Sequence, residues 1–168
     1  DCCAGTGGML SVAEEYLHEL NPDARLEVFG QELNPESYAI CKADLMIKGQ
    51  NASNIKKGNS ISEDQLSNQK FDYLITNPPF GVKWAKFAKK VKEEHEQLGQ
   101  GGRFGAGLPS VGDGSFLFLM HLMSKMKPDG SRLAIVFNGS PLFSGSPSKT
   151  KNESSIRQWI IENDLLES

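Results

Sequence analysis

The sequence has 168 residues, 38% of them hydrophobic, which is the size of one α/β domain with one sizeable core. A net charge of −3 excludes the strongly basic composition of domains that grip nucleic acid unaided, so a DNA substrate would need a second chain for much of its binding. No run of about eighteen apolar residues and no basic leader occurs, which excludes a membrane span or signal peptide and predicts a cytoplasmic protein.

Helical and extended patterns alternate along the chain. The first half is predicted to contain a glycine-rich turn at 4–8, a helix over 9–20, a strand over 25–30, a helix over 35–49 and a weak strand near 52–57. The second half is predicted to contain a strand over 71–76, helices over 83–98 and 115–126, a strand over 132–137 and a helix over 155–167. Pro35 suits the first turn of its helix, and Ser154 and Ser155 are capping-type residues for the last one. This alternation predicts an α/β fold with a parallel sheet and helices on both faces. Ligands bind such sheets outside the carboxyl ends of the strands, so the turns there are the candidate sites.

The first such turn is DCCAGTGG at positions 1–8. Gly5, Gly7 and Gly8 directly before a helix let the backbone approach a ligand and present free N–H groups. A tight turn without a ligand explains the glycines equally well. Glu32 ends the next strand, where an acidic side chain binds the ribose hydroxyls of an adenosine cofactor, and this favours the binding interpretation.

The second turn is Asn77-Pro78-Pro79-Phe80, which follows the apolar strand. An amide oxygen of Asn77 and the carbonyl of Pro78, restrained by Pro79, can accept the two N–H groups of an exocyclic amine and aim its lone pair at an electrophile. Phe80 offers a face on which an extruded base can stack. The alternative is a proline-rich turn in which Asn77 bonds its own backbone.

Other features leave two interpretations open. The glycine-rich segment 99–114 reads as a surface loop or as a segment that faces substrate. The five lysines between 83 and 92 are by default a solvated face, with DNA phosphates as a minority alternative. We expect His121 to be a core histidine within a buried helix. Phe137 and Asn138 border a target pocket or form a plain turn.

The cysteines, Cys2, Cys3 and Cys41, are odd in number and two of them are adjacent. This spacing suits neither a disulfide framework nor a spaced zinc site, so we expect reduced thiols and no metal.

Blocks along nearly the whole chain resemble the modification subunit of type I restriction-modification systems. They include DCCAGTGG, GQELNPESYAIC, GNSIS, FDYLITNPPFG and FGAGLPSVGDGSFLFLMHLMSKMKPDGSRLAIVF. Members of this family are S-adenosylmethionine-dependent adenine-N6 DNA methyltransferases. The resemblance implies a Rossmann-like methyltransferase fold, of which residues 1–168 form part of the catalytic domain. The first central strand and the strands after the last helix are expected to lie outside this stretch, and we expect the stretch alone to be inactive.

The resemblance also implies the roles of individual residues. The cofactor's methionine and sulfonium part would lie against Asp1, Ala4, Gly5, Thr6, Gly7 and Gly8. Its ribose would bind Glu32 and its adenine Asn59, while Asn77, Pro78, Pro79 and Phe80 would hold the target adenine. The implied partners are double-stranded DNA with a flipped adenine, a specificity subunit, a second modification subunit and a restriction subunit.

Two departures from the family pattern occur. The usual DPACGTGG reads DCCAGTGG here, and an asparagine, Asn59, stands where many members have aspartate. Two rival functions stay open: a protein-glutamine methyltransferase, whose motif is usually NPPY, and a catalytically silent scaffold of the same fold.

Overall fold

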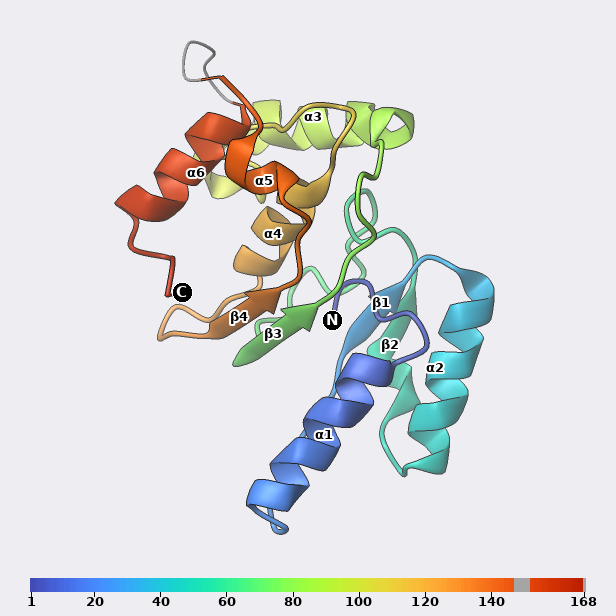
Figure 1. The fold of residues 1–168 in the computed structure, drawn as a ribbon. Coiled ribbons are helices and arrows are strands. Elements are labelled where there is room, and N and C mark those ends of the chain that lie inside the picture. The colour runs from blue at the N-terminus through green and yellow to red at the C-terminus, as the bar shows by residue number, and fades with distance from the viewer. Residues whose placement is uncertain (147–151, 168) are drawn as a thin grey trace.

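The structure, a computed structural model, describes residues 1–146 and 152–167. Within these described residues, four short parallel strands form two separate two-stranded sheets (Figure 1). In the first sheet, β1 (Gly30–Glu32) pairs with β2 (Ile55–Lys57). In the second, β3 (Tyr73–Thr76) pairs with β4 (Arg132–Ile135). The predicted parallel α/β architecture is confirmed.

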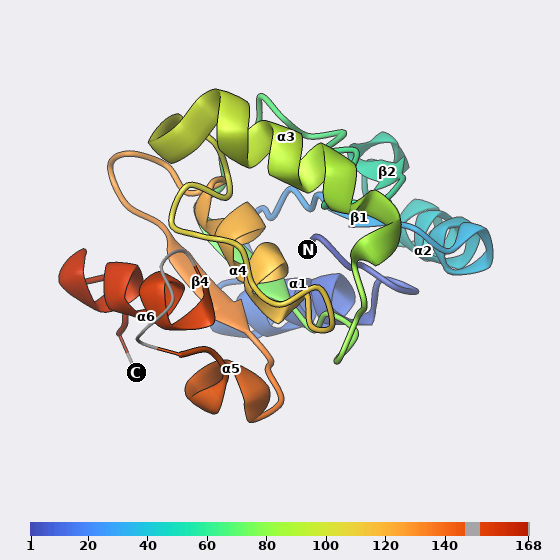
Figure 2. The same ribbon diagram turned by 90° about the horizontal axis from the view of Figure 1, so that it is seen from above.

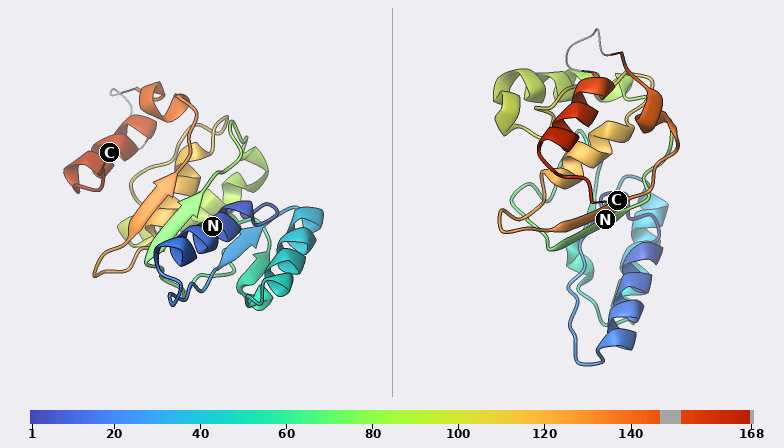
Figure 3. Two further views of the ribbon diagram at one scale, coloured as in Figure 1. Left: turned by 60° about the horizontal axis from the view of Figure 1, so that its bottom comes forward. Right: turned by 60° about the vertical axis from the view of Figure 1, so that its left-hand side comes forward.

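The two sheets lie side by side, with the start of the chain between them (Figure 3). Asp1 extends the first sheet, because its N–H group donates to the carbonyl of Phe29 and its carbonyl accepts from the N–H of Gln31, both at 3.0 Å. This is the hydrogen-bond pattern of a parallel pair. Asp1 therefore occupies a strand position at the inner edge of β1.

Each sheet has its own apolar core. Helices α1 (Gly8–Leu20) and α2 (Pro35–Ile47) pack on the first sheet through Leu10, Cys41 and Leu45. Helices α3 (Ala88–Leu98), α4 (Ser115–Met123) and α6 (Glu153–Glu162) surround the second core. A short helix, α5 (Ser140–Phe143), lies beside α6 (Figure 2).

The helix α4 is buried on most of its surface, as its uninterrupted apolar sequence predicted. No helix in the described part of the chain is long and apolar enough to cross a membrane. The three cysteines are free, as predicted.

Several predicted boundaries were wrong. The strand expected over 25–30 begins only at Gly30, because the ladder with β2 starts at the Gly30–Ile55 pair, although Val28 before it is buried. The weak strand near 52–57 is a 3-10 turn over Ala52–Asn54 followed by β2.

The helices also differ at their starts. The helix expected from Lys83 begins at Ala88 after a 3-10 turn over Ala85–Phe87. The last helix is capped by Asn152, whose side-chain oxygen accepts from the backbone N–H groups of Ser154 and Ser155 at 2.9 and 3.4 Å. The two serines lie within the first turn and do not cap it. The helix ends at Glu162, five residues before the end of the predicted helix over 155–167.

Candidate functional site: a cavity between the two sheets

The glycine turn crosses from the first sheet into α1. The N–H of Ala4 donates to the carbonyl of Gln31 at 3.1 Å, and the N–H of Gly7 donates back to the carbonyl of Ala4 at 2.8 Å. Gly5 and Gly7 have φ of +55° and +91°, in the region that favours glycine. A Cβ on Gly7 would also lie 2.9 Å from the Sγ atom of Cys41, so any side chain there would require Cys41 on α2 to shift.

The side chain of Glu32 orders the loops on both sides of it. Its two carboxylate oxygens accept the backbone N–H groups of Gly5 and Asn34, each at 2.7 Å. Because a carboxylate has about four lone-pair sites, acceptor capacity remains for hydroxyl donors. Glu32 is half-buried at the carboxyl end of β1, which is the position the sequence predicted for it.

Asn59 lies in the turn after β2. Its side-chain oxygen accepts the N–H groups of Ile61 and Ser62 at 3.0 and 3.3 Å, which fixes the side chain in an Asx turn. The amide NH₂ group of Asn59 is left as the donor.

The NPPF turn follows β3 and combines buried and exposed residues. Thr76, the last residue of the strand, is fully buried, and its hydroxyl donates to Oδ1 of Asp1 at 2.6 Å. Pro78 is buried, whereas Asn77 and Pro79 are exposed and Phe80 is 52% exposed. The same Oδ1 of Asp1 accepts the N–H of Cys3 at 2.8 Å, so one carboxylate connects the glycine turn to the end of β3.

A cavity of about 500 Å³ lies where these turns meet. The first sheet contributes Glu32, Asn34 and Asn59 to its lining, and the second half of the chain contributes Pro79, Phe87 and Phe118. The cavity thus lies at the carboxyl ends of β1, β2 and β3, as the rule for open α/β sheets predicts. Its volume is within the range of about 300–1,000 Å³ that is usual for small-molecule sites.

Arg103 binds the backbone that forms one wall of the cavity. Its guanidinium donates to the carbonyls of Ser60 and Ile61 at 2.9 and 2.8 Å and forms a salt bridge of 2.6 Å with Glu94 on α3. Only 15% of the Arg103 side chain and 18% of the Glu94 side chain are exposed. The hydroxyl of Ser60 in turn donates to the carbonyl of Cys2 at 2.6 Å, which continues the link into the glycine turn.

His121 on α4 completes this network. Nη1 of Arg103 lies 3.0 Å from Nδ1 of His121, and since a guanidinium only donates, Nδ1 must be the acceptor. Burial, together with the positive charge of Arg103, lowers the pKa of His121 to about 3. The imidazole is therefore neutral at physiological pH, and His121 is the satisfied core histidine that the sequence predicted.

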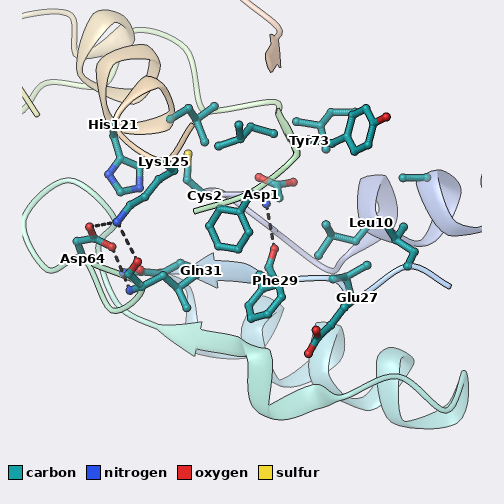
Figure 4. Close-up of a pocket in the computed structure, with 18 residues that line it drawn as sticks. Asp1, Cys2, Leu10, Glu27, Phe29, Gln31, Asp64, Tyr73, His121 and Lys125 are labelled. Atoms are coloured by element: carbon teal, nitrogen blue, oxygen red, sulfur yellow. Dashed lines mark hydrogen bonds and ion pairs between the residues drawn. The ribbon is translucent and has the colours of Figure 1, made fainter. Parts of the chain in front are cut away.

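A second, smaller cavity of about 110 Å³ separates the two sheets (Figure 4). Apolar residues such as Leu10, Phe29 and Leu74 line it, together with Asp1 and Cys2. At one end Lys125 forms an ion pair with Asp64 and donates to the carbonyl of Leu66 at 2.9 Å. The Asp64 and Lys125 side chains are 11% and 6% exposed, so this ion pair lies in the interior of the protein.

The structure brings together part of the predicted site. Glu32, Asn59 and Pro79 line the larger cavity, and Asn77 and Phe80 are exposed next to Pro79. Asp1 lines the smaller cavity, while Ala4, Gly5, Thr6, Gly7 and Gly8 line neither of the two. Phe137 and Asn138 follow β4 and line neither of the two cavities, and the Asn138 side chain accepts the N–H of Ser140 at 3.1 Å.

Sequence reasoning missed Asn34, Phe87, Phe118 and Arg103. Asn34 caps α2 and directly precedes Pro35, and an asparagine before a proline is a sequence signal for a helix start. Phe87 and Phe118 read only as core positions of helices. Arg103 is the single basic residue in the glycine-rich segment 99–114, a contrast that singles it out.

Solved structures identify the class of fold. Over 96% of this chain, the type I restriction-modification methyltransferase subunit from Streptococcus thermophilus superposes with a TM-score of 0.76 at 25% identity. The type I restriction enzyme EcoKI M protein superposes with a TM-score of 0.65 at 20% identity, a likeness of fold alone. The fold is therefore a Rossmann-like α/β methyltransferase fold, and this chain covers 32% of either subunit.

The chain belongs to the N-6 DNA Methylase family, whose model matches residues 1–168. It is 30% identical to the type I restriction enzyme MjaIX methylase subunit of Methanocaldococcus jannaschii and 28% identical to the HindI methylase subunit of Haemophilus influenzae. Both alignments cover 99% of this chain but only 28% and 35% of the two relatives. The chain thus spans about a third of the length of the methylase subunits that it resembles.

Proposed function

We propose that this chain forms the catalytic centre of a DNA methyltransferase subunit that transfers a methyl group from S-adenosylmethionine to N6 of adenine. The observation that carries the proposal is the larger cavity, because Glu32 and Asn59 line one side of it and Pro79, from the NPPF turn, lines the other. A cofactor that lies in this cavity would meet the target base at the turn. The family and the methylase relatives support the same reaction.

The residues fit S-adenosylmethionine as the cofactor. The remaining lone pairs of Glu32 can accept hydrogen bonds from the two ribose hydroxyls. The amide NH₂ of Asn59 can donate to a ring nitrogen of the adenine, and Phe87 and Phe118 supply apolar surface. The cofactor would contribute an electrophilic methyl carbon on a sulfonium. In this proposal Asp1 and the glycines do not contact the cofactor, and they act by setting the position of Glu32.

Catalysis by the NPPF turn would depend on positioning. The side-chain oxygen of Asn77 and the carbonyl of Pro78 would accept the two N–H groups of the adenine amino group, which directs the nitrogen lone pair toward the methyl carbon. The N–C bond would form as the S–C bond breaks, S-adenosylhomocysteine would be the leaving group, and the methylated nitrogen would release one proton to water. Phe80 would stack on the base after it leaves the duplex.

The proposal includes the partners and the location. We propose double-stranded DNA as substrate, a specificity subunit that selects the sequence, a second copy of the methylase subunit, a restriction subunit that joins them, and a cytoplasmic complex. The relatives are named as type I restriction enzyme subunits, which supports an assembly of this kind.

The test uses the full-length protein copurified with its specificity subunit and incubated with DNA and methyl-labelled S-adenosylmethionine. The DNA is digested to nucleosides and the labelled nucleoside identified. We expect label in N6-methyladenosine, and a fall of at least about 10²-fold in rate for Asn77→Ala, since two positioned acceptors become one. Asn138→Ala is the matched control, because Asn138 also follows a strand but its side chain serves a local turn.

Three outcomes would contradict the proposal. Label in N4-methylcytosine would keep the mechanism and change the base. Label in protein would indicate the glutamine methyltransferase alternative. Cofactor binding with no label at all would indicate a silent scaffold.

A further inference from the structure

The segment 83–92 is the most basic stretch of an otherwise acidic chain. Five of its ten residues are lysines and none is acidic, whereas the whole chain has a net charge of −3. The lysine face, as we name this surface, consists of Lys83, Lys86, Lys89, Lys90 and Lys92, and all five are exposed. A feature this local does not follow from the overall composition.

The other side of the same segment forms part of the larger cavity. Val82 and Phe87 line the cavity, and Trp84 and Val91 are buried with 1% exposure. The apolar residues therefore face inward and the lysines outward, over the stretch that starts three residues after Phe80. Figure 1 shows this stretch running from the end of β3 up into α3.

Helix stability does not account for the lysine face. The amino-terminal end of a helix is its positive end, where acidic residues stabilise and lysines do not. In α3 the order is reversed: the first turn has no acidic residue and no side-chain cap, and Glu93, Glu94 and Glu96 come later. Glu94 is turned inward to Arg103 and does not offset the lysines.

Most of the lysine charge is also unpaired. Lys89 reaches Glu93 at 3.8 Å and Lys90 reaches Glu63 at 3.2 Å, in pairs whose side chains are about half exposed or more. Within residues 1–146 and 152–167, the side chains of Lys83, Lys86 and Lys92 have no ion-pair or hydrogen-bond partner. The positive end of the helix and three free ammonium groups thus attract anions at the same place.

We propose that the lysine face binds the phosphates of the DNA strand next to the flipped base. This inference rests on the proposed function, since it places the strand that supplies the base. Contacts to the phosphates fix the register of a protein on DNA, and a nucleotide can be turned out of the duplex only if its backbone is held. The lysine face supplies that hold beside the cavity, and the specificity subunit reads the sequence elsewhere.

The experiment measures DNA affinity as a function of salt for the full-length complex with its specificity subunit. The variant is Lys83→Gln/Lys86→Gln/Lys92→Gln, and the readout is the slope of log affinity against log potassium chloride concentration. Each lost phosphate contact should reduce the slope by about 0.9, hence by about 2.7 for each copy of the chain that is engaged. The arginine triple variant at the same positions should keep the slope.

The matched control removes the same charge from the opposite end of the strands. Lys70 and Lys127 precede β3 and β4, and Lys48 follows α2, so the triple Lys48→Gln/Lys70→Gln/Lys127→Gln should leave the slope unchanged. Equal slopes for the two glutamine triples would overturn the proposal. So would loss of the specificity subunit from the lysine-face variant, which would make this surface a subunit interface.

Methylation by the unmodified complex is assayed in parallel, so failure of the proposed function shows as absence of N6-methyladenosine whatever the slopes are.

Discussion

The two halves of the molecule present different chemistry around the cavity between them. The half built on β1 and β2 presents backbone shaped by Gly5 and Gly7 and held by Glu32. The half built on β3 and β4 presents exposed side chains, Asn77 and Phe80, on a rigid proline turn. In the proposed function, the first surface would hold the cofactor and can be fixed internally, whereas the second would receive the flipped base and must leave its groups accessible.

The two apolar cores are separate clusters, but Cys2 and Ile61 from the first half belong to the second cluster, and polar contacts also join the halves near the site. The hydroxyl of Thr76 bonds Asp1, the hydroxyl of Ser60 bonds Cys2, and Arg103 bonds the carbonyls that follow Asn59. Hydrogen bonds are directional, so they can fix the cavity walls more precisely than apolar packing alone. The comparison therefore predicts that substitutions in the polar links disturb the site more than substitutions within either core.

The largest effect is expected for Arg103→Met. Glu94 is left nearly buried without its partner, and breaking a buried ion pair by removing one member costs about 3–5 kcal/mol. Urea unfolding of the full-length protein measures this loss, and calorimetry measures the weaker binding of S-adenosylmethionine that should accompany it. The second substitution Glu94→Leu should restore part of the stability by removing the unpaired charge.

Arg132→Met is the control for this prediction, because its ion pair with Glu167 has side chains that are 74% and 75% exposed. Exposed pairs contribute about 0–1 kcal/mol. If the two arginine variants lose similar stability, Arg103 is not the link that the geometry indicates.

The backbone of the half built on β1 and β2 is tested by Gly7→Ala. A non-glycine residue held at unfavourable φ costs about 1–3 kcal/mol, and the new Cβ would also meet Sγ of Cys41 at 2.9 Å. Gly5→Ala isolates the first contribution, since no atom lies within 4 Å of its Cβ position. We expect the larger fall in melting temperature for Gly7→Ala and partial recovery in Gly7→Ala/Cys41→Ala. Equal losses at both glycines would mean that contact with α2 is irrelevant.

The exposed side chains of the half built on β3 and β4 are tested by Phe80→Ala. Stacking of a base on an aromatic ring contributes about 1–3 kcal/mol, so kcat/KM for DNA should fall about 5- to 150-fold. Affinity for S-adenosylmethionine should not change, because Phe80 does not line the larger cavity. Phe80→Tyr should retain activity, and Phe143→Ala, at an 81% exposed position on α5, should have no effect. A parallel loss of cofactor affinity in Phe80→Ala would remove the distinction between the halves.

The sequence predicted those parts of the fold and site that have local causes. Pro35 marks the start of α2, and the prolines of the NPPF turn mark the end of β3. Strand limits were missed because a ladder depends on the partner strand, so β1 begins where β2 pairs with it and not where the apolar pattern begins. α5 was missed because its four residues form barely one turn.

The link through Arg103 could not be read from the sequence for a related reason. Its acceptors are the backbone carbonyls of Ser60 and Ile61, which are more than forty positions away and which every residue type carries. Only the fold shows that the glycine-rich segment around Arg103 is tied to the cavity wall.

The smallest effect at neutral pH is expected for His121→Asn, yet it tests the same link by its pH dependence. The folded pKa of His121 is about 3, below its ordinary value of about 6.5, so the unfolded chain binds more protons between these values. Stability of the wild-type protein should therefore fall as pH falls below about 6.5, by up to about 1.4 kcal/mol per pH unit from this group. The oxygen of asparagine can replace Nδ1 as acceptor for Arg103 but cannot take up a proton. Urea unfolding at pH 7 and pH 5.5 should show a smaller loss for the variant than for the wild type, and identical losses would mean that His121 is not held neutral by burial beside Arg103.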